Sequence, residues 1–159
     1  MKRVKVKCGK AKLTAPAWLA NIWPDDMPPE DFPTFCGAGS GWGDWLVPDK
    51  FWGVNGSASC LLHDLGWATS ADTVSAFLAE NWYLAKNIRA QVLASDIAWW
   101  RKELATIRAW ALYFVAVSTF GAFAFDPRSK DDERPLDNPI VKARLKRLAM
   151  AHIGLGGVA

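Results

Sequence analysis

Apolar residues recur at helical spacing in three stretches of the chain, and these stretches predict its main helices. The first covers about residues 57–70, with Ser57 as the expected N-cap. The second begins near residue 70 or 72 and reaches about residue 94, and the third covers about residues 98–125. A shorter, basic amphipathic helix is expected over residues 140–153. The pattern therefore predicts a mainly α protein.

The segments outside these helices are rich in charge, proline or glycine. Residues 1–12 hold six basic residues that alternate in part with valines, which predicts a short edge strand or a loose basic arm. Residues 15–34 hold five prolines and predict a loop, because proline removes a backbone donor and fixes φ. Residues 36–56 hold six glycines and predict a second loop, whose backbone can approach a ligand closely. Residues 127–139 are charged, hold three prolines and predict a solvated linker.

The longest uncharged run, from Ala109 to Phe125, is a candidate for a membrane span. Its length is at the lower limit for a spanning helix, about 17 residues, and Ser118, Thr119 and Gly121 make it less hydrophobic. We therefore expect an additional long apolar helix that is buried in the core. A small membrane protein that uses residues 109–125 as its span is the alternative.

Composition and charge narrow the class of protein. The chain has 159 residues, of which 51% are hydrophobic, so it is long and apolar enough for one domain with a real core. A net charge of +3 is too small to indicate a nucleic-acid partner. The first residues carry charge but no apolar stretch, so we expect no secretory signal and a reducing compartment by default. Ten tryptophans suit either a core or a lipid–water boundary.

His63 and Asp64 are the side chains most suited to chemistry. Neighbouring residues of a helix project about 100° apart, so the two can flank one ligand but cannot grip it in parallel. A carboxylate in this position can hold a hard cation while the imidazole faces a reacting group. Asp44 and Asp49 lie in the preceding glycine-rich loop, and carboxylates with free backbone carbonyls are what calcium requires.

The same residues carry a resemblance to a known family. The motif consists of Phe35-Cys36-Gly37-Ala38-Gly39, then Val47-Pro48-Asp49, and then Cys60-Leu61-Leu62-His63-Asp64-Leu65-Gly66-Trp67. It resembles the phospholipase A2 superfamily, in which a Cys-Gly-x-Gly calcium loop precedes a helix with Cys-x-x-His-Asp, and it is most similar to the branch encoded by phages and prophages. The resemblance covers roughly residues 35–90. It implies a helical hairpin with a glycine-rich calcium loop.

The resemblance also implies a role for each matching residue. His63 would be the general base that takes a proton from water, and Asp64 would be a calcium ligand. Backbone carbonyls of Gly37 and Gly39 would complete part of the calcium shell, and Asp44 or Asp49 could supply a further carboxylate as in bacterial members. The implied reaction is the calcium-dependent hydrolysis of glycerophospholipid esters at a phospholipid or membrane surface.

Further implied positions support the imidazole and the loop. Trp67 takes the place of a tyrosine that steadies the catalytic network in the family, although an indole can only donate. Cys36 and Cys60 match a disulfide of the secreted animal enzymes. The family also needs a carboxylate on the following helix to orient the imidazole, and here the sequence departs from the pattern. Asp72 is the nearest acid, whereas an alternative alignment places Ser75 there.

The resemblance divides the chain into three parts. Residues 1–34 would be a basic arm and a proline-rich loop, residues 35–126 the phospholipase A2-like domain, and residues 127–159 a charged linker with a basic C-terminal helix. The expected location is the cytoplasm or a virion, with peripheral contact to a membrane.

Two other hypotheses stay open at this point. A non-catalytic phage structural or interaction protein that keeps the fold would explain the missing carboxylate. Alternatively, Cys36, Cys60 and His63 could bind zinc, for which Cys8 or an aspartate would have to be the fourth ligand.

Overall fold

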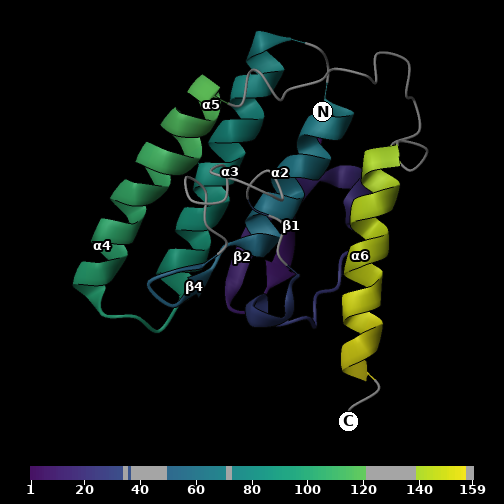
Figure 1. The fold of residues 1–159 in the computed structure, drawn as a ribbon, viewed down its shortest axis with the longest axis horizontal. Coiled ribbons are helices and arrows are strands. Elements are labelled where there is room, and N and C mark those ends of the chain that lie inside the picture. Colours follow the sequence, from purple (N-terminus) through teal and green to yellow (C-terminus); the bar gives the residue numbers. More distant parts are fainter. Residues whose placement is uncertain (34–35, 37–49, 71–72, 121–138, 157–159) are drawn as a thin grey trace.

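A pair of antiparallel helices forms the centre of the molecule. The computed structural model describes residues 1–33, 36, 50–70, 73–120 and 139–156. Helix α2 (Ser57–Thr69) lies against helix α3 (Val74–Ala94), and Figure 1 shows the two between the other helices. Side-chain hydrogen bonds join Ser59 to Gln91 and Ser70 to Glu80, so the two helices run in opposite directions. The predicted helical hairpin is therefore present in a mainly helical protein.

The ends of these helices are set by local hydrogen bonds. The N-cap of α2 is Gly56, so Ser57, predicted for this role, is instead the first residue of the helix, and its backbone N–H donates to Asn55 Oδ1 at 2.9 Å. At the start of α3, Thr73 Oγ1 accepts from the N–H of Ala76 at 3.1 Å. Nearly every residue of α2 is buried because neighbouring elements cover it on several sides. The side chains of α2 that face α3 are consequently shielded from solvent.

A longer helical run packs along the other side of α3. It consists of α4 (Trp99–Arg108), a π-helical stretch η3 (Ala109–Ala116) and α5 (Val117–Phe120), which follow one another without a break. The prediction of an additional long apolar helix is wrong. Charged residues occupy α4, and the uncharged part within the described residues is confined to η3 and α5. Among all the residues that the structure describes, no helix is both long and apolar enough to cross a membrane.

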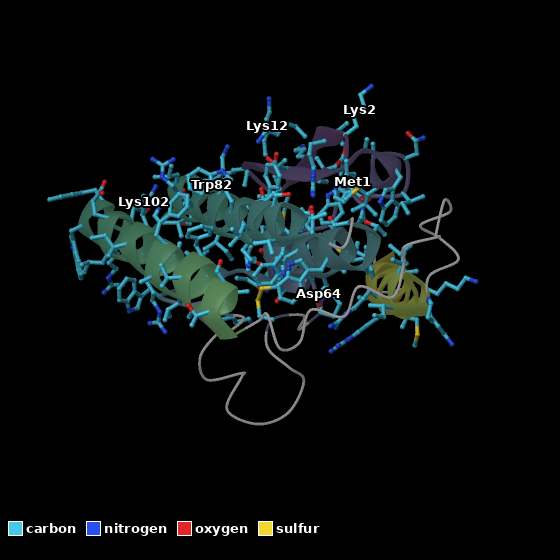
Figure 2. The ribbon with its side chains drawn as sticks, turned by 90° about the horizontal axis from the view of Figure 1, so that it is seen from above. Met1, Lys2, Lys12, Asp64, Trp82 and Lys102 are labelled. Carbon is cyan, nitrogen blue, oxygen red and sulfur yellow. A yellow bond between two sulfur atoms is a disulfide. The ribbon has the colours of Figure 1, made fainter. Side chains whose placement is uncertain are left out.

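The N-terminal residues form a β-hairpin that belongs to the same core. Strands β1 (Arg3–Cys8) and β2 (Ala11–Pro16) pair antiparallel, with Val6 opposite Leu13. The hairpin packs on α2 and α3, and Figure 2 shows Lys2 and Lys12 on this side of the molecule. The strand predicted for this segment is present, whereas the loose basic arm is not. In β1, buried Val6 and Cys8 alternate with exposed Lys5 and Lys7, which places one face of this strand toward the core.

The remaining short elements flank the central pair. The proline-rich segment contains two short 3₁₀ turns, η1 (Ala17–Leu19) and η2 (Pro29–Asp31). Strands β3 (Lys50–Phe51) and β4 (Val54–Asn55) form a small hairpin just before α2, and Gly53 between them has a φ of 85°. This positive φ favours glycine at the turn.

The last helix, α6 (Pro139–Gly156), lies against α2 on the side away from α4 (Figure 1). Its fully buried Val141 and nearly buried Leu148 join the same hydrophobic core as the hairpin and the central helices. The basic C-terminal helix is therefore docked on the helix that carries His63. This contact brings α6 close to the candidate site.

Candidate functional site

The imidazole of His63 points from α2 toward α3. The side chain is largely buried, and its Nε2 lies 2.9 Å from Oδ1 of Asn81, which is fully buried on α3. The residue that faces the ring is therefore an amide, and it is neither of the two candidates that the sequence offered. Ser75 is exposed, and its hydroxyl lies 3.2 Å from that of Thr73. Asp72 is outside the described residues.

Trp67 determines which atoms of this contact donate and accept. Its indole Nε1, one helical turn after His63, lies 3.1 Å from the same Asn81 Oδ1. Because an indole N–H can only donate, the Asn81 atom that it meets must be the amide oxygen. The His63 nitrogen that meets this oxygen must then carry a proton. In the neutral ring, Nε2 is therefore the donor and Nδ1 is the acceptor.

The other end of the amide completes the assignment. Asn81 Nδ2 donates to Ser118 Oγ on α5 at 3.1 Å. The Trp67 ring also lies 4.2 Å from the His63 ring and 5.4 Å from the Phe77 ring, measured between centroids. These contacts hold the amide, the indole and the imidazole in one orientation. Trp67 therefore contacts both Asn81 and His63, and the catalytic role that the resemblance implies for it stays a prediction.

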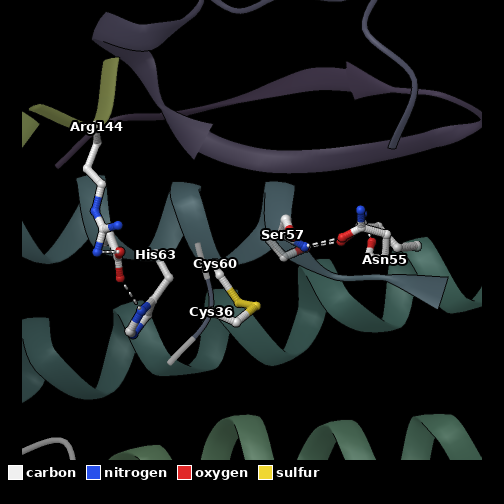
Figure 3. Close-up of a disulfide and its surroundings, with 9 residues drawn as sticks. Cys36, Asn55, Ser57, Cys60, His63 and Arg144 are labelled. Atoms are coloured by element: carbon white, nitrogen blue, oxygen red, sulfur yellow. Dashed lines mark hydrogen bonds and ion pairs between the residues drawn. A yellow bond between two sulfur atoms is a disulfide. The ribbon is translucent and has the colours of Figure 1, made fainter. Parts of the chain in front are cut away.

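Asp64 lies beside the unprotonated nitrogen of the ring. Its Oδ1 is 3.6 Å from His63 Nδ1, and its Oδ2 is 2.6 Å from Nη2 of Arg144 on α6. Figure 3 shows Arg144 reaching down from α6 toward the helix that carries His63. One carboxylate thus stands between an imidazole and a guanidinium. Asp64 is therefore placed to stabilise positive charge on either neighbour.

The chemistry of Asp64 fits the calcium ligand that the resemblance implies. It is a partly exposed carboxylate next to the candidate base, and calcium prefers hard oxygen ligands. The other expected ligands, Gly37, Gly39, Asp44 and Asp49, lie outside the described residues. Within the part of the chain that is described, no group of three or more His, Cys, Asp or Glu could hold a metal ion.

A disulfide ties the start of the glycine-rich segment to α2. Cys36 and Cys60 are joined, with their Cα atoms 5.1 Å apart, and Cys60 lies one turn before His63 (Figure 3). This is the pair that the resemblance implies. Two oxidised sulfurs cannot serve as thiolate ligands, so this structure contradicts zinc binding through these cysteines. Cys8 is free and buried, and burial raises the pKa of its thiol to about 12, with a smaller contribution from the charge of Glu30.

The sequence did not indicate that three residues would contact the site: Asn81, Ser118 and Arg144. For Asn81 a signal existed, because it falls on the apolar face of α3 with Phe77, Leu84 and Ile88. A polar residue on such a face needs a partner, and this requirement is a pointer to His63. Arg144 gave no comparable signal, since several basic residues surround it on α6.

No family model, curated protein or solved structure matches the chain. Membership of the phospholipase A2 superfamily therefore stays a prediction from the motif at residues 35–67.

Proposed function

We propose that this chain is a phospholipase A2-like hydrolase of glycerophospholipid esters that depends on calcium and uses His63 as its general base. The observation that carries the proposal is the Asn81 amide oxygen, which accepts hydrogen bonds from both His63 Nε2 and Trp67 Nε1. This arrangement leaves Nδ1 as the basic nitrogen, next to the carboxylate of Asp64. A base needs a free lone pair and a fixed orientation, and both follow from these contacts.

In the proposed reaction, His63 Nδ1 takes a proton from a water molecule as its oxygen attacks the ester carbonyl. The carboxylate of Asp64 stabilises the imidazolium that forms. The same nitrogen then returns the proton to the departing alcohol, so the ring is neutral again at the end. Asn81 holds the ring throughout through Nε2 and takes no proton, because its oxygen is a neutral amide acceptor.

Calcium would be held by Asp64, with the loop candidates Gly37, Gly39 and Asp44 or Asp49. Once bound, it would supply positive charge that polarises the ester carbonyl.

The lipid partner is supported by an exposed apolar stripe on the α4–η3 run. The stripe consists of Trp100, Leu104 and Ile107, which lie at successive helical turns, and of Val115 further along the run, and each is about half exposed or more. Arg101 lies over the Trp100 ring, with its Cζ atom 5.1 Å from the centroid. Apolar side chains flanked by cations suit the boundary between lipid headgroups and acyl chains. We propose that this stripe contacts the phospholipid surface.

The test of the reaction is the release of fatty acid from phospholipid vesicles, with calcium and with a calcium chelator. We expect His63→Ala to lower the rate by about 10²- to 10⁴-fold, the usual contribution of a general base. Ser75→Ala is the matched control and should keep the rate of the unmodified chain, because its side chain is exposed and bonds only near its own turn. Equal rates in the His63→Ala variant and the unmodified chain would contradict the proposal.

A non-catalytic structural or interaction protein is the second candidate, and two observations favour it. An amide, rather than a carboxylate, faces His63, and Arg144 already neutralises Asp64. Under this alternative, the network would serve only to join α2, α3 and α6. The absence of calcium-dependent hydrolysis in a folded, disulfide-bonded preparation would favour it over the enzyme.

A further inference from the structure

We propose that Arg144 is an intramolecular competitor of calcium, which holds the Asp64 carboxylate until the metal ion displaces it. This inference rests on the proposed function, because it concerns the regulation of the same site. Its starting point is the 2.6 Å contact between Arg144 Nη2 and Asp64 Oδ2. Both side chains are partly buried, so solvent screens their attraction less than it would at an open surface.

The guanidinium and a calcium ion would compete for this carboxylate. Oδ2 is occupied by Arg144, and Oδ1 faces the His63 ring. A divalent cation on Asp64 would lie within a few ångströms of the guanidinium, and the two positive charges would repel each other. This repulsion favours the departure of Arg144 from Asp64 when calcium binds there. The affinity of the site for calcium then includes the free energy of breaking this ion pair.

The position of Arg144 on α6 makes the contact part of how that helix docks. Val141 precedes Arg144 by three residues and Leu148 follows it by four, so all three lie on one face of the helix. Val141 and Leu148 are buried against the core, which fixes the backbone on either side of Arg144. The guanidinium is thus presented to Asp64 by a docked helix. Lys146, by contrast, is exposed on the same helix and provides a control for the loss of charge alone.

The experiment measures calcium binding by isothermal titration calorimetry on the full chain. Arg144→Gln should bind calcium about five- to tenfold more tightly than the unmodified chain, the effect of removing one partly buried competing ion pair. Lys146→Gln removes the same charge from an exposed position and should bind like the unmodified chain. Arg144→Met is a second neutral variant in case the glutamine variant folds poorly. Arg144→Lys, which keeps the charge, should bind more weakly than either neutral variant.

Thermal unfolding supplies a second readout that does not depend on catalysis. A ligand that binds more tightly stabilises the folded state more at the same concentration. Calcium should therefore raise the Tm of Arg144→Gln more than that of the unmodified chain. Asp64→Asn should abolish calcium binding in both backgrounds. If Asp64→Asn in the Arg144→Gln background still binds calcium as tightly as Arg144→Gln alone, calcium lies elsewhere and the competition is refuted.

The remaining outcomes separate this inference from the proposed function. Equal calcium affinity in the unmodified chain and in both neutral variants overturns the competition but leaves a calcium site intact. No calcium binding in any of these proteins overturns the competition together with the calcium requirement of the proposed reaction. Tighter binding in Arg144→Gln without hydrolysis by any variant supports the competition and contradicts the enzyme.

Discussion

Gly66 on α2 lies directly against the buried carboxylate of Glu80 on α3. A Cβ atom at position 66 would overlap Glu80 Oε2, an atom without a hydrogen-bond partner among the described residues. The other oxygen, Oε1, accepts from Arg3 and from Ser70, so the carboxylate is held in place and cannot easily retreat. This close approach lies one turn from the His63 network and sets the spacing of α2 and α3.

The Gly66→Ala substitution tests this contact by the sign of its effect. Alanine in a helix interior normally stabilises by up to about 1 kcal/mol relative to glycine. Here we expect destabilisation by about 1–3 kcal/mol, because the methyl group overpacks a filled site. Urea unfolding measures the difference. In a Glu80→Ala background the same substitution should become neutral or stabilising, and destabilisation of equal size there would contradict the steric explanation.

Asn81→Asp is expected to raise the rate of the proposed hydrolysis by about tenfold, because a carboxylate stabilises the imidazolium better than an amide does. Asn81→Leu should lower the rate by about ten- to a hundredfold, since the ring loses the group that orients it. Initial rates on phospholipid vesicles provide the measurement. The aspartate variant should also be less stable by about 1–3 kcal/mol, because it buries a charge. Equal rates in all three proteins would show that position 81 does not act through His63.

Trp67→Phe should change the tautomer of His63 while the fold stays intact. Without the indole donor, the Asn81 amide is no longer forced to present its oxygen to Nε2, so the proton can move to Nδ1 in part of the molecules. Nitrogen chemical shifts of the His63 ring, recorded by NMR, report the position of the proton directly. An unchanged tautomer in this variant would refute the role assigned to Trp67. The hydrolysis rate should fall in parallel with the lost tautomer.

Replacement of Trp100 and Ile107 by serine should weaken binding to phospholipid vesicles by about tenfold, since each buried apolar side chain contributes about 1.5–3 kcal/mol at most and only part of it enters the lipid. Co-sedimentation with vesicles measures the bound fraction. Hydrolysis of a short-chain ester in free solution should remain unchanged, because neither residue belongs to the His63 network. Full vesicle binding by the double variant would rule out the stripe as the lipid contact.

Thiol titration tests the disulfide and the state of Cys8 together. The native protein should show almost no reactive thiol at pH 8, because Cys8 is buried and its raised pKa of about 12 keeps it protonated. Unfolding without reductant should expose one thiol, and unfolding with prior reduction should expose all three cysteines of the chain. Three reactive thiols without reduction would mean that Cys36 and Cys60 are not joined in that preparation.

The helices of this fold could be predicted from the sequence because their signals are local. The periodicity over residues 57–70, and from residue 70 or 72 to about residue 94, marks α2 and α3 within a few residues. Which side chain of α3 meets His63 depends on how the two helices pair, and no local pattern fixes that pairing. The sequence therefore indicated Asp72 or Ser75 as the partner of His63, whereas the helices bring Asn81 to the ring.

The hairpin and the docking of α6 were beyond prediction for the same reason. Alternating valines indicate a strand but do not identify its partner, which is the segment Ala11–Pro16. Similarly, the basic residues of α6 look alike in the sequence, and only the burial of Val141 and Leu148 selects Arg144 for Asp64. The apolar run after residue 109 continues directly from the charged α4, so it forms no separate long apolar helix.

The Asn81 oxygen, which accepts from both His63 and Trp67, also restricts which nitrogen of the imidazole can exchange a proton. Both hydrogens that it receives come from donors that keep them, and the amide has no capacity to accept a proton outright. The imidazole consequently donates through Nε2 toward α3 and has Nδ1 on the side of Asp64. A proton that Nδ1 gains must therefore also leave from Nδ1, so proton uptake and proton release take place on one side of the ring.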